Sequence, residues 1–363
     1  MGTFQFKPLL QGHDTIECSY YLHASGASCG LDFERLAIER ESLRDAKGRG
    51  QKQRVINLGG VDFMLAPNGS SSGYPFIIAN PDWTISFGEF NNPSFYVKYR
   101  SEALWREGVQ ASHQKFCAWA AGLGLETIKG EGLARVDFTF DYQIPVIDFD
   151  RDSVVSMSSK ESNWRQDGDD QTLQYGVGDV VLRIYDKIAE IEGNSGKVWF
   201  EQLWGVFENV WRIEWQVRKE ILKRFGIRSF QDLDDQQGDL LRYLAHEHDT
   251  LRIKGEDSNR SRLPLHPLWI DLQERIKAFN QIGIYRAIDD QTVLEQRRMT
   301  IAIAMYGYTK RLAAIDALLS HKKSLTIQEA LQQSNHLIGQ VHDGLTWGPD
   351  VAKRMDQMRL GQW

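Results

Sequence analysis

A tyrosine flanked by two cations is the first feature of this sequence that could do chemistry. Residues 180–187 alternate apolar and polar side chains, and Arg183, Tyr185 and Lys187 share the polar side. A phenol has an ordinary pKa of about 10 and is a weak nucleophile at neutral pH. Nearby cations favour the phenolate, which can attack phosphorus. This run is therefore a candidate for phosphoryl transfer, with Tyr185 as the attacking group.

Two other runs supply carboxylates in the same alternation. The polar sides of residues 133–142 and 210–218 carry Arg135, Asp137, Thr139 and Asp141 in the first run and Arg212, Glu214, Gln216 and Arg218 in the second. If the three runs lie in one sheet, Asp137, Asp141 and Glu214 converge beside Tyr185. Carboxylates are the ligands that Mg²⁺ or Mn²⁺ prefers, and arginines hold phosphate oxygens. The solvated face of any antiparallel sheet alternates in the same way, so the competing interpretation is a polar surface without chemistry.

The three runs, taken in order, resemble the Rep_trans replication initiation factor family. That family contains rolling-circle replication initiators of plasmids and related relaxases of conjugative elements. Its Arg-aliphatic-Tyr-Asp/Asn-Lys motif carries the nicking tyrosine, which corresponds to Tyr185. An Arg-Ile/Val-Glu motif corresponds to Arg212 and Glu214, and an Arg-Ile/Val-Asp motif to Arg135 and Asp137. The match spans roughly residues 133–218, and the Gly-Val-Gly-Asp turn at 176–179 departs from the Gly-Ser-Arg often found there.

The resemblance implies a replication initiator that nicks and rejoins origin DNA through a 5′-phosphotyrosine intermediate, in rolling-circle replication of a plasmid or other mobile element. Tyr185 would be the nucleophile, and Arg183 and Lys187 would act beside it at the phosphate. Glu214 and Asp137, with Asp141 as a third candidate, would hold Mg²⁺ or Mn²⁺ as the cofactor. The DNA-contacting set would be Arg135, Arg212, Arg218, Lys219, Lys223 and Arg224.

The expected partner is single-stranded or hairpin origin DNA. A helicase, other replication proteins and a second copy of the chain in a homodimer are further partners that this function allows. A conjugative relaxase would share the cleavage chemistry, and genetic context would separate it from an initiator. A non-enzymatic DNA-binding regulator on the same fold would form no covalent adduct, and a buried Tyr185 unpaired with carboxylates would favour it. An unrelated sheet protein would neither bind nor cleave DNA.

The remaining pattern predicts an α+β fold, with a largely antiparallel β-sheet core, flanking helices and a C-terminal helical region. Three parts are expected: residues 1–54, with a charged helix at 32–46 and a basic loop; the sheet-based nicking domain, 55–228; and helices over 229–363. Further strands are expected at 55–58, 61–65, 76–79, 84–87 and 95–99, and helices at 109–123, 234–251, 268–279, 293–319 and 327–341. The first thirty residues look irregular apart from a short strand at 15–22, and no internal repeat is visible.

The bulk composition fits a folded protein of the reducing cytoplasm. The 363 residues are 42% hydrophobic and 25% charged, enough for a substantial core. The net charge of -6 counts against a protein that coats nucleic acid, although an enzyme needs only a local basic groove. Three cysteines without a CxxC pair indicate neither a disulfide framework nor a zinc knuckle. No apolar run is long enough to cross a bilayer, so no membrane partner is expected.

One further cluster, His246-Glu247-His248-Asp249, invites a metal interpretation. Leucines precede it at helical spacing, and residues two apart on a helix do not face one another. A surface helix is therefore the expectation here. The dense tryptophans and phenylalanines between 199 and 215 are expected to pack in the core, with stacking on single-stranded bases as the alternative for one or two of them.

Overall fold

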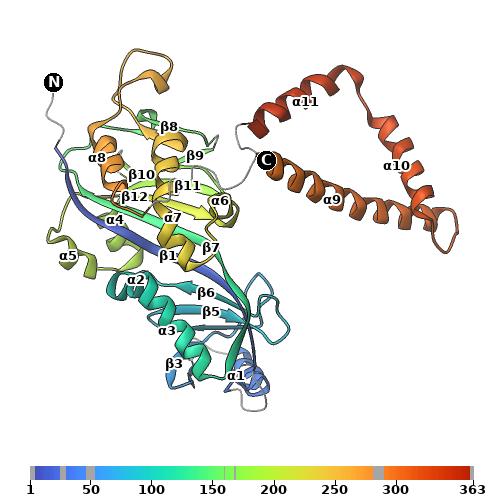
Figure 1. Ribbon diagram of the computed structural model, residues 1–363, viewed down its shortest axis with the longest axis horizontal. Helices are drawn as coiled ribbons and strands as arrows, with labels where there is room; N and C mark the ends of the chain where they lie inside the picture. Colours follow the sequence, from blue (N-terminus) through green and yellow to red (C-terminus); the bar gives the residue numbers. More distant parts are fainter. Residues whose placement is uncertain are drawn as a thin grey trace. The chain divides into compact units, whose positions relative to one another are not determined.

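The computed structural model describes residues 5–24, 30–45, 54–158, 160–166, 169–280 and 290–359. The chain divides into two compact units, Met1–Ala287 and Ile288–Trp363. The first unit contains one large antiparallel sheet with helices on both faces, and the second contains only helices among its described residues (Figure 1). The α+β class with a C-terminal helical region is therefore confirmed. The division does not fall after residue 228, because the two helices that follow pack on the sheet.

The large sheet has eleven strands, and its two longest strands lie side by side in the middle. The order across the sheet is β2-β3-β4-β5-β6-β1-β7-β12-β11-β10-β9. The strands of one half, which we name the first arm, are β1 (Lys7–Ala24), β2 (Arg54–Leu58), β3 (Val61–Leu65), β4 (Phe76–Ala79), β5 (Trp83–Phe87) and β6 (Phe95–Tyr99). Those of the second arm are β7 (Leu125–Gln143), β9 (Glu161–Gln166), β10 (Asp169–Tyr175), β11 (Val180–Asp186) and β12 (Val210–Arg218).

The two arms follow the same plan. Each begins with its long central strand and places its last strand next to that one, followed outward by the earlier strands. The central pairs Gly12–Thr139, Ile16–Val136 and Ser19–Gly132 lie symmetrically about Ile16–Val136. A local two-fold axis at that pair relates residues 12–19 of β1 to residues 132–139 of β7, 120 positions later. The sheet is thus a structural duplication that the sequence does not reveal, because strand pairing requires only alternating side chains.

Strand β1 is the largest difference from the sequence-based expectation. Residues 7–24 form one continuous strand that pairs with both β6 and β7, rather than an irregular segment with a short strand. Its pairing with β7 is interrupted by several register shifts, one of them between His13 and Thr15. Residues 7–13 show no two-residue alternation in the sequence, because they include Pro8, the adjacent Leu9 and Leu10, and Gly12, so the pattern indicated only the later part of the strand.

One face of the central strands is apolar and is covered by helices. Trp215 of β12 meets Trp269 of α8 (Pro267–Ile276) edge-on, and Tyr99 of β6 meets Phe230 of α7 (Phe230–Tyr243) in the same way. Phe116 of α3 (Val109–Gly122) packs on Tyr99 as well. These contacts explain why α7 and α8 belong to the first unit. They bury apolar surface against the sheet, at about 25 cal/mol per Å².

The opposite face of the second arm is covered at one end only. The chain leaves β11 into α4 (Lys187–Glu190), the short turn η2 (Ile191–Ser195) and α5 (Trp199–Trp204), and returns in β12. Phe200 and Trp204 of α5 form a small second core with Ile191 and Val210. The remaining helices of this unit are α1 (Phe33–Asp45), α2 (Ser101–Glu107) and α6 (Lys219–Arg224). The predicted basic loop at 47–54 lies outside the described residues, apart from Arg54.

A two-stranded sheet and the second unit complete the description. Strand β13 (Asp249–Leu251) pairs with β8 (Val154–Ser156), and the short turns η1 (Arg151–Ser153), η3 (Leu244–His248) and η4 (Arg260–Arg262) lie beside them in the sequence. The expected helix at 234–251 is α-helical to Tyr243 and continues as the π-helical turn η3 to His248, with His246 and Glu247 exposed as expected, and Asp249 begins strand β13. The second unit consists of α9 (Asp290–Leu319), α10 (Ile327–Val341) and α11 (Gly344–Arg359). No described helix is both long enough and apolar enough to cross a membrane.

Candidate active site

A tight hairpin positions Tyr185. Strands β10 and β11 are joined by residues 176–179, and Gly176 and Gly178 both have positive φ angles, 91° and 96°. A Cβ atom on Gly176 would lie 2.3 Å from the Val180 carbonyl oxygen, so this turn requires glycine. The hairpin sets the register that pairs Arg183 with Gln174 and Tyr185 with Thr172 of β10. On its other side β11 pairs Arg183 with Glu214 and Tyr185 with Arg212 of β12.

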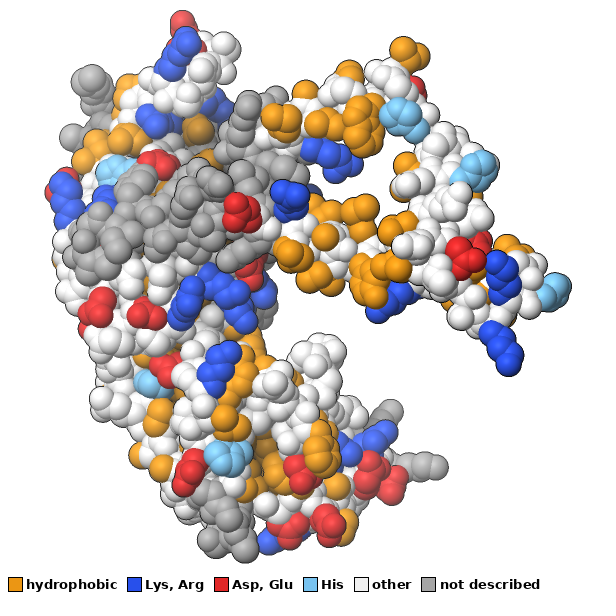
Figure 2. Space-filling model, turned by 45° about the vertical axis from the view of Figure 1, so that its right-hand side comes forward, with side chains coloured by type: hydrophobic (Ala, Val, Ile, Leu, Met, Phe, Trp, Pro, Cys, Tyr) orange, Lys and Arg blue, Asp and Glu red, His pale blue; other side chains and the backbone are white. Residues whose placement is uncertain are grey.

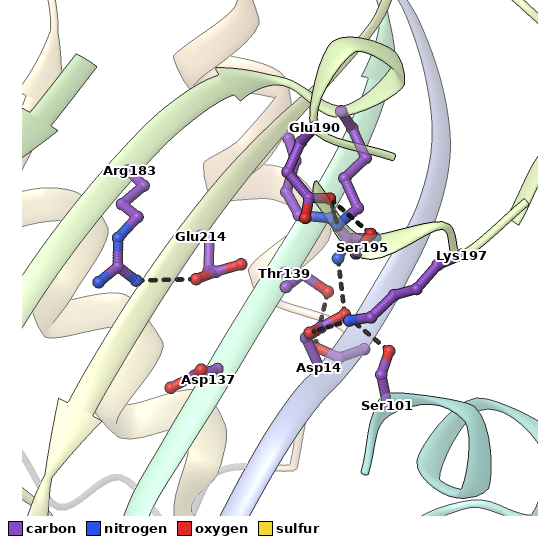
Figure 3. A network of polar contacts seen from close by, with 12 residues as sticks. Asp14, Ser101, Asp137, Thr139, Arg183, Glu190, Ser195, Lys197 and Glu214 are labelled. Carbon is purple, nitrogen blue, oxygen red and sulfur yellow. Dashed lines mark hydrogen bonds and ion pairs between the residues drawn. The ribbon is translucent and has the colours of Figure 1, made fainter. Parts of the chain in front are cut away.

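Tyr185, Glu214 and Arg183 form the centre of the site. The Tyr185 hydroxyl donates to Oε2 of Glu214 at 2.9 Å, and Arg183 Nη1 donates to Oε1 of the same carboxylate at 2.9 Å. Figure 3 shows Arg183 and Glu214 facing each other, with Asp137 close by. Gln174 and Gln216 accept the other Arg183 hydrogen bonds, at 3.1 and 3.3 Å. Sequence reasoning did not assign either glutamine to the site.

The phenol of Tyr185 is protonated at neutral pH in this arrangement. Its side chain is only 8% exposed, and burial together with the negative charge of Glu214 raises its pKa well above the usual 10. The sequence pattern predicted that Arg183 and Lys187 would favour the phenolate. Arg183 instead bonds to Glu214, so the group that contacts the phenol is the carboxylate. Glu214 is therefore in position to accept the phenolic proton.

Asp137 lies on the same side of the sheet and is held by Arg135. Nε of Arg135 donates to Oδ1 of Asp137 at 2.7 Å, and Nη2 donates to Oδ2. Burial raises the pKa of Asp137 to about 7, with the charge of Glu214 adding to the rise and Arg135 opposing it. Two carboxylates that repel one another through a buried site are an arrangement that an added cation would stabilise.

Asp141 and Arg212 form a closed ion pair. Arg212 Nε donates to Asp141 Oδ1 at 2.6 Å and Nη2 donates to Oδ2 at 2.9 Å, while the Trp204 indole donates to Oδ2 at 2.8 Å. Both charged residues are 0% exposed beneath α5, and the Arg212 guanidinium lies 4.5 Å from the Phe200 ring centroid. The alternating sequence pattern correctly placed Asp141 and Arg212 on the polar face of the sheet. Helix α5 covers this part of the face, so neither side chain is in contact with solvent. In this geometry Asp141 has no room for a metal, and Arg212 has none for a phosphate.

Asp14 is a central residue that sequence reasoning missed. Its Oδ1 accepts from Arg212 Nη1 and from the Ser101 hydroxyl, both at 2.8 Å, and its Oδ2 pairs with Lys197 at 2.9 Å (Figure 3). Burial opposes the charge of Asp14, but Arg212 and Lys197 together hold its pKa below the usual range. Asp14 lies at the register shift of β1, which no sequence pattern indicated. It joins β1, α2 and the segment that follows η2 to the floor of the site.

Lys187 lies beside Tyr185 but contacts another partner. Its ammonium is 5.5 Å from the Tyr185 ring centroid and donates to Glu190. The side chain is 2% exposed, and burial, reinforced by Arg212, lowers its pKa. The predicted contact of Lys187 with phosphate is therefore not preformed, and the residue ties α4 to the site.

The other predicted DNA-contacting residues lie where β12 ends. Arg218 and Lys219 are exposed, and Lys223 and Arg224 of α6 are partly exposed. Lys and Arg side chains gather in a patch around the middle of the first unit (Figure 2). These cations do not join the Tyr185–Glu214 cluster, so they could contact DNA only beside it.

The site offers a metal ion two of the three predicted carboxylates, Asp137 and Glu214. Within the described ranges, no three His, Cys, Asp or Glu side chains form a group that could hold a metal ion. Asp137 and Glu214 remain, on adjacent strands and facing the same side. Mg²⁺ is commonly held by one or two carboxylates together with substrate phosphate oxygens. Asp137 and Glu214 are therefore the carboxylates that would hold a hard cation arriving with its phosphate, each giving up one of its present hydrogen bonds, and the fully enclosed Asp141 is not part of this set.

Comparisons with known proteins give one structural neighbour to report. No protein-family model matches the chain, and no curated protein sequence matches it. Among solved structures, the chain is similar to a rolling circle replication initiator protein from Geobacillus stearothermophilus, with 17% sequence identity and a TM-score of 0.40. The match covers 76% of this chain and 98% of that chain. A TM-score of this size does not establish a shared function, so the side chains of the site must carry the functional inference.

Proposed function

We propose that the protein nicks and rejoins single-stranded DNA through a phosphotyrosine intermediate, as a rolling-circle replication initiator. The observation that carries this proposal is the hydrogen bond from the Tyr185 hydroxyl to Glu214, with Arg183 on the same carboxylate. A nucleophile, its base and a cation that orients the base are the parts that tyrosine-based phosphoryl transfer requires. A buried tyrosine without a carboxylate partner would instead have favoured a non-enzymatic regulator.

The chemistry balances without a nucleotide cofactor. Tyr185 Oη attacks the scissile phosphorus, its proton passes to Glu214, and a bond forms between Oη and phosphorus. The bond from phosphorus to the 3′ oxygen breaks, and that oxygen takes up one proton to become a free 3′-hydroxyl. The new ester keeps the strand's 5′ phosphate on Tyr185. Because one phosphodiester replaces another, the reverse reaction can rejoin the strand, with Glu214 returning the proton to Tyr185.

Asp137 and Glu214 would hold Mg²⁺ or Mn²⁺ when DNA is bound. Such an ion polarises the scissile phosphate and offsets charge that develops on its oxygens. Arg183 keeps the Glu214 carboxylate turned toward the phenol, and Arg135 does the same for Asp137 toward the centre of the site. The buried Arg212–Asp141 pair holds the strands on which these groups stand.

A covalent-adduct assay tests the proposal. The protein is incubated with single-stranded origin DNA and Mn²⁺, and a denaturant-resistant protein–DNA species is measured on a gel. We expect an adduct that requires the metal and disappears in Tyr185→Phe. Tyr175→Phe is the matched control, because Tyr175 is also buried and hydrogen-bonded, to the Arg151 carbonyl oxygen, on the neighbouring strand β10.

Other outcomes would redirect the proposal. An adduct that persists in Tyr185→Phe would keep the enzyme class and move the nucleophile elsewhere. Tight binding of origin DNA without any adduct would favour the regulator. A strand that is nicked at the origin of a conjugative element, and not at a replication origin, would make the protein a relaxase with the same chemistry.

A further inference from the structure

A cluster of tyrosines and cations lies on the polar face of the first arm, away from Tyr185. Tyr74 and Tyr96 have ring centroids 6.5 Å apart, and Lys129 lies 4.9 Å from the centroid of the Tyr21 ring. Burial raises the pKa of Tyr74, and the nearby Tyr21 adds to the rise. Tyr21 and Tyr96 are partly exposed, and Lys129 is exposed. We name Tyr21, Tyr96, Lys98, Lys129 and Arg218 the tyrosine platform.

The platform is positively charged overall. Lys98 and Arg218 are exposed, and the strand pairings place Arg218, Arg135, Glu17 and Lys98 in one row across β12, β7, β1 and β6. The neighbouring carboxylate, Glu17, is already engaged by the Tyr96 hydroxyl at 2.5 Å and by Arg135 at 3.4 Å. The cations of the platform therefore exceed the negative charge beside it. Aromatic rings interleaved with cations are the arrangement that binds single strands, by stacking bases and pairing phosphates.

The platform is continuous with the candidate active site. Arg135 donates to Asp137 on one side and to Glu17 on the other, and Glu17 accepts from Tyr96. Strands β12, β7, β1 and β6 are consecutive in the sheet. Glu214 on β12 and Tyr96 on β6 are three strand spacings apart, about 14 Å. They are also offset by seven residues along the strands, about 23 Å, because Glu214 lies level with Gly12 of β1 and Tyr96 with Ser19, so about 27 Å separates them. A few nucleotides of an extended strand span that distance.

We propose that the tyrosine platform binds the single-stranded DNA that flanks the nicked phosphodiester, with bases stacked on Tyr96 and Tyr21 and phosphates paired with Lys129, Lys98 and Arg218. This inference rests on the proposed function only for the site to which the strand leads. Binding to the platform can be measured without cleavage.

Fluorescence anisotropy with Tyr185→Phe protein and a labelled single-stranded oligonucleotide of about 20 nucleotides tests the binding directly. In the Lys129→Ala/Arg218→Ala variant we expect affinity to fall roughly tenfold at low salt. The slope of log affinity against log salt should become shallower by about 1.4, because two phosphate contacts are lost at about 0.7 each. In Tyr96→Leu we expect a roughly tenfold loss with an unchanged salt slope, because stacking carries no charge.

The matched control is Lys254→Ala/Lys277→Ala, which removes the same charge from exposed residues outside the platform. It should leave affinity and slope close to those of the parent protein. An equal loss in this control, or an equal loss for single- and double-stranded DNA in the platform variants, would overturn the proposal. Thermal unfolding of each variant verifies that the fold is intact.

A second readout separates this inference from the proposed function. With Tyr185 present, the platform variant should need more DNA for half-maximal nicking and keep the single-turnover rate at saturation. If the platform variant nicks DNA with an unchanged dependence on DNA concentration, the proposed binding to the platform is refuted and the proposed nicking activity stands. Single-strand binding that depends on the platform without any nicking would refute the enzyme and leave the platform.

Discussion

Corresponding positions in the two arms of the sheet carry different chemistry. The second arm has Arg183, Glu214 and Asp137, and the first arm has Ser86, Tyr96 and Glu17 at the matching places. Tyr185 has no counterpart, because β5 ends at Phe87 and Gly88 already belongs to the turn. The same backbone plan therefore carries the proposed nucleophile and base in one arm and an aromatic surface in the other.

The apolar faces of the two arms, by contrast, are alike. Cys18, Tyr20 and Leu22 of β1 correspond to Phe138, Phe140 and Tyr142 of β7, and all six are buried. Each arm needs one face to bury against helices, so that face is constrained by packing. The other face is free of this requirement, and it is there that the arms differ. The difference teaches that packing constrains the apolar face of both arms and leaves the polar face free to differ.

The largest expected effect concerns Glu214, the proposed base in the second arm. In Glu214→Gln the amide oxygen can still accept from Tyr185 but cannot take its proton. We expect the single-turnover rate of adduct formation to fall about 10²–10⁴-fold. Ser86 of the first arm occupies the position that Arg183 has in the second arm. Ser86→Ala should leave the rate within about twofold of wild type. An unchanged rate in Glu214→Gln would mean that the phenolic proton leaves by another route.

The next effect concerns the buried cation of the second arm. Arg212→Met leaves Asp141 and Asp14 without their shared partner, and we expect a loss of about 3–5 kcal/mol in the free energy of unfolding. Ser94, the corresponding residue of the first arm, bonds to the backbone of Leu22 and, at 3.4 Å, to the Tyr20 carbonyl oxygen, and Ser94→Ala should cost about 1 kcal/mol. Urea denaturation measures both. Similar losses in the two variants would contradict the contrast between the arms.

The third prediction concerns His13 of β1, next to the two-fold axis, and the pH dependence of the free energy of unfolding. Burial lowers the pKa of His13 to about 4, against an ordinary 6.5. The unfolded chain therefore binds more protons between these values, and stability that is complete above pH 6.5 is lost as pH falls toward 4. The loss from His13 is at most ~3 kcal/mol. In His13→Gln the free energy of unfolding should fall less steeply with acid, while His113, His246 and His266 act equally in both proteins. Parallel pH curves would contradict the burial of a neutral His13.

The smallest expected effect concerns the helix over the apolar face near the axis. Ser229 caps α7, accepting from the Asp232 amide at 3.1 Å, and Asp232 accepts from the Ser229 amide at 2.9 Å. Ser229→Ala should lower the free energy of unfolding by about 1 kcal/mol and leave adduct formation unchanged. Urea denaturation and the gel assay measure the two quantities. A change in adduct formation would show that the apolar face also controls the site.

Much of the fold followed from local pattern. Strands β3, β4, β6 and β12 and helix α10 have the bounds that alternation or helical spacing predicted. The residues that could form the site were also found, because Tyr185, Arg183 and Glu214 share polar faces of regular strands. Asp14 was missed because a register shift in β1 hides it. The closure over Arg212 and Asp141 was missed because it depends on α5, which packs there through Phe200 and Trp204.

The sequence by itself determined which residues face which side of each strand, since a two-residue period leaves no other arrangement of Asp137, Asp141, Arg212 and Glu214. Only the tertiary structure decided which of these polar residues meet each other and which are sealed from water. Burial beneath α5 makes Arg212 and Asp141 a supporting ion pair, while Glu214, a short way along the same strand, contacts Tyr185. Environment rather than residue type sets the role of a charge, because desolvation and neighbouring charges determine what it can bond and what proton it can hold.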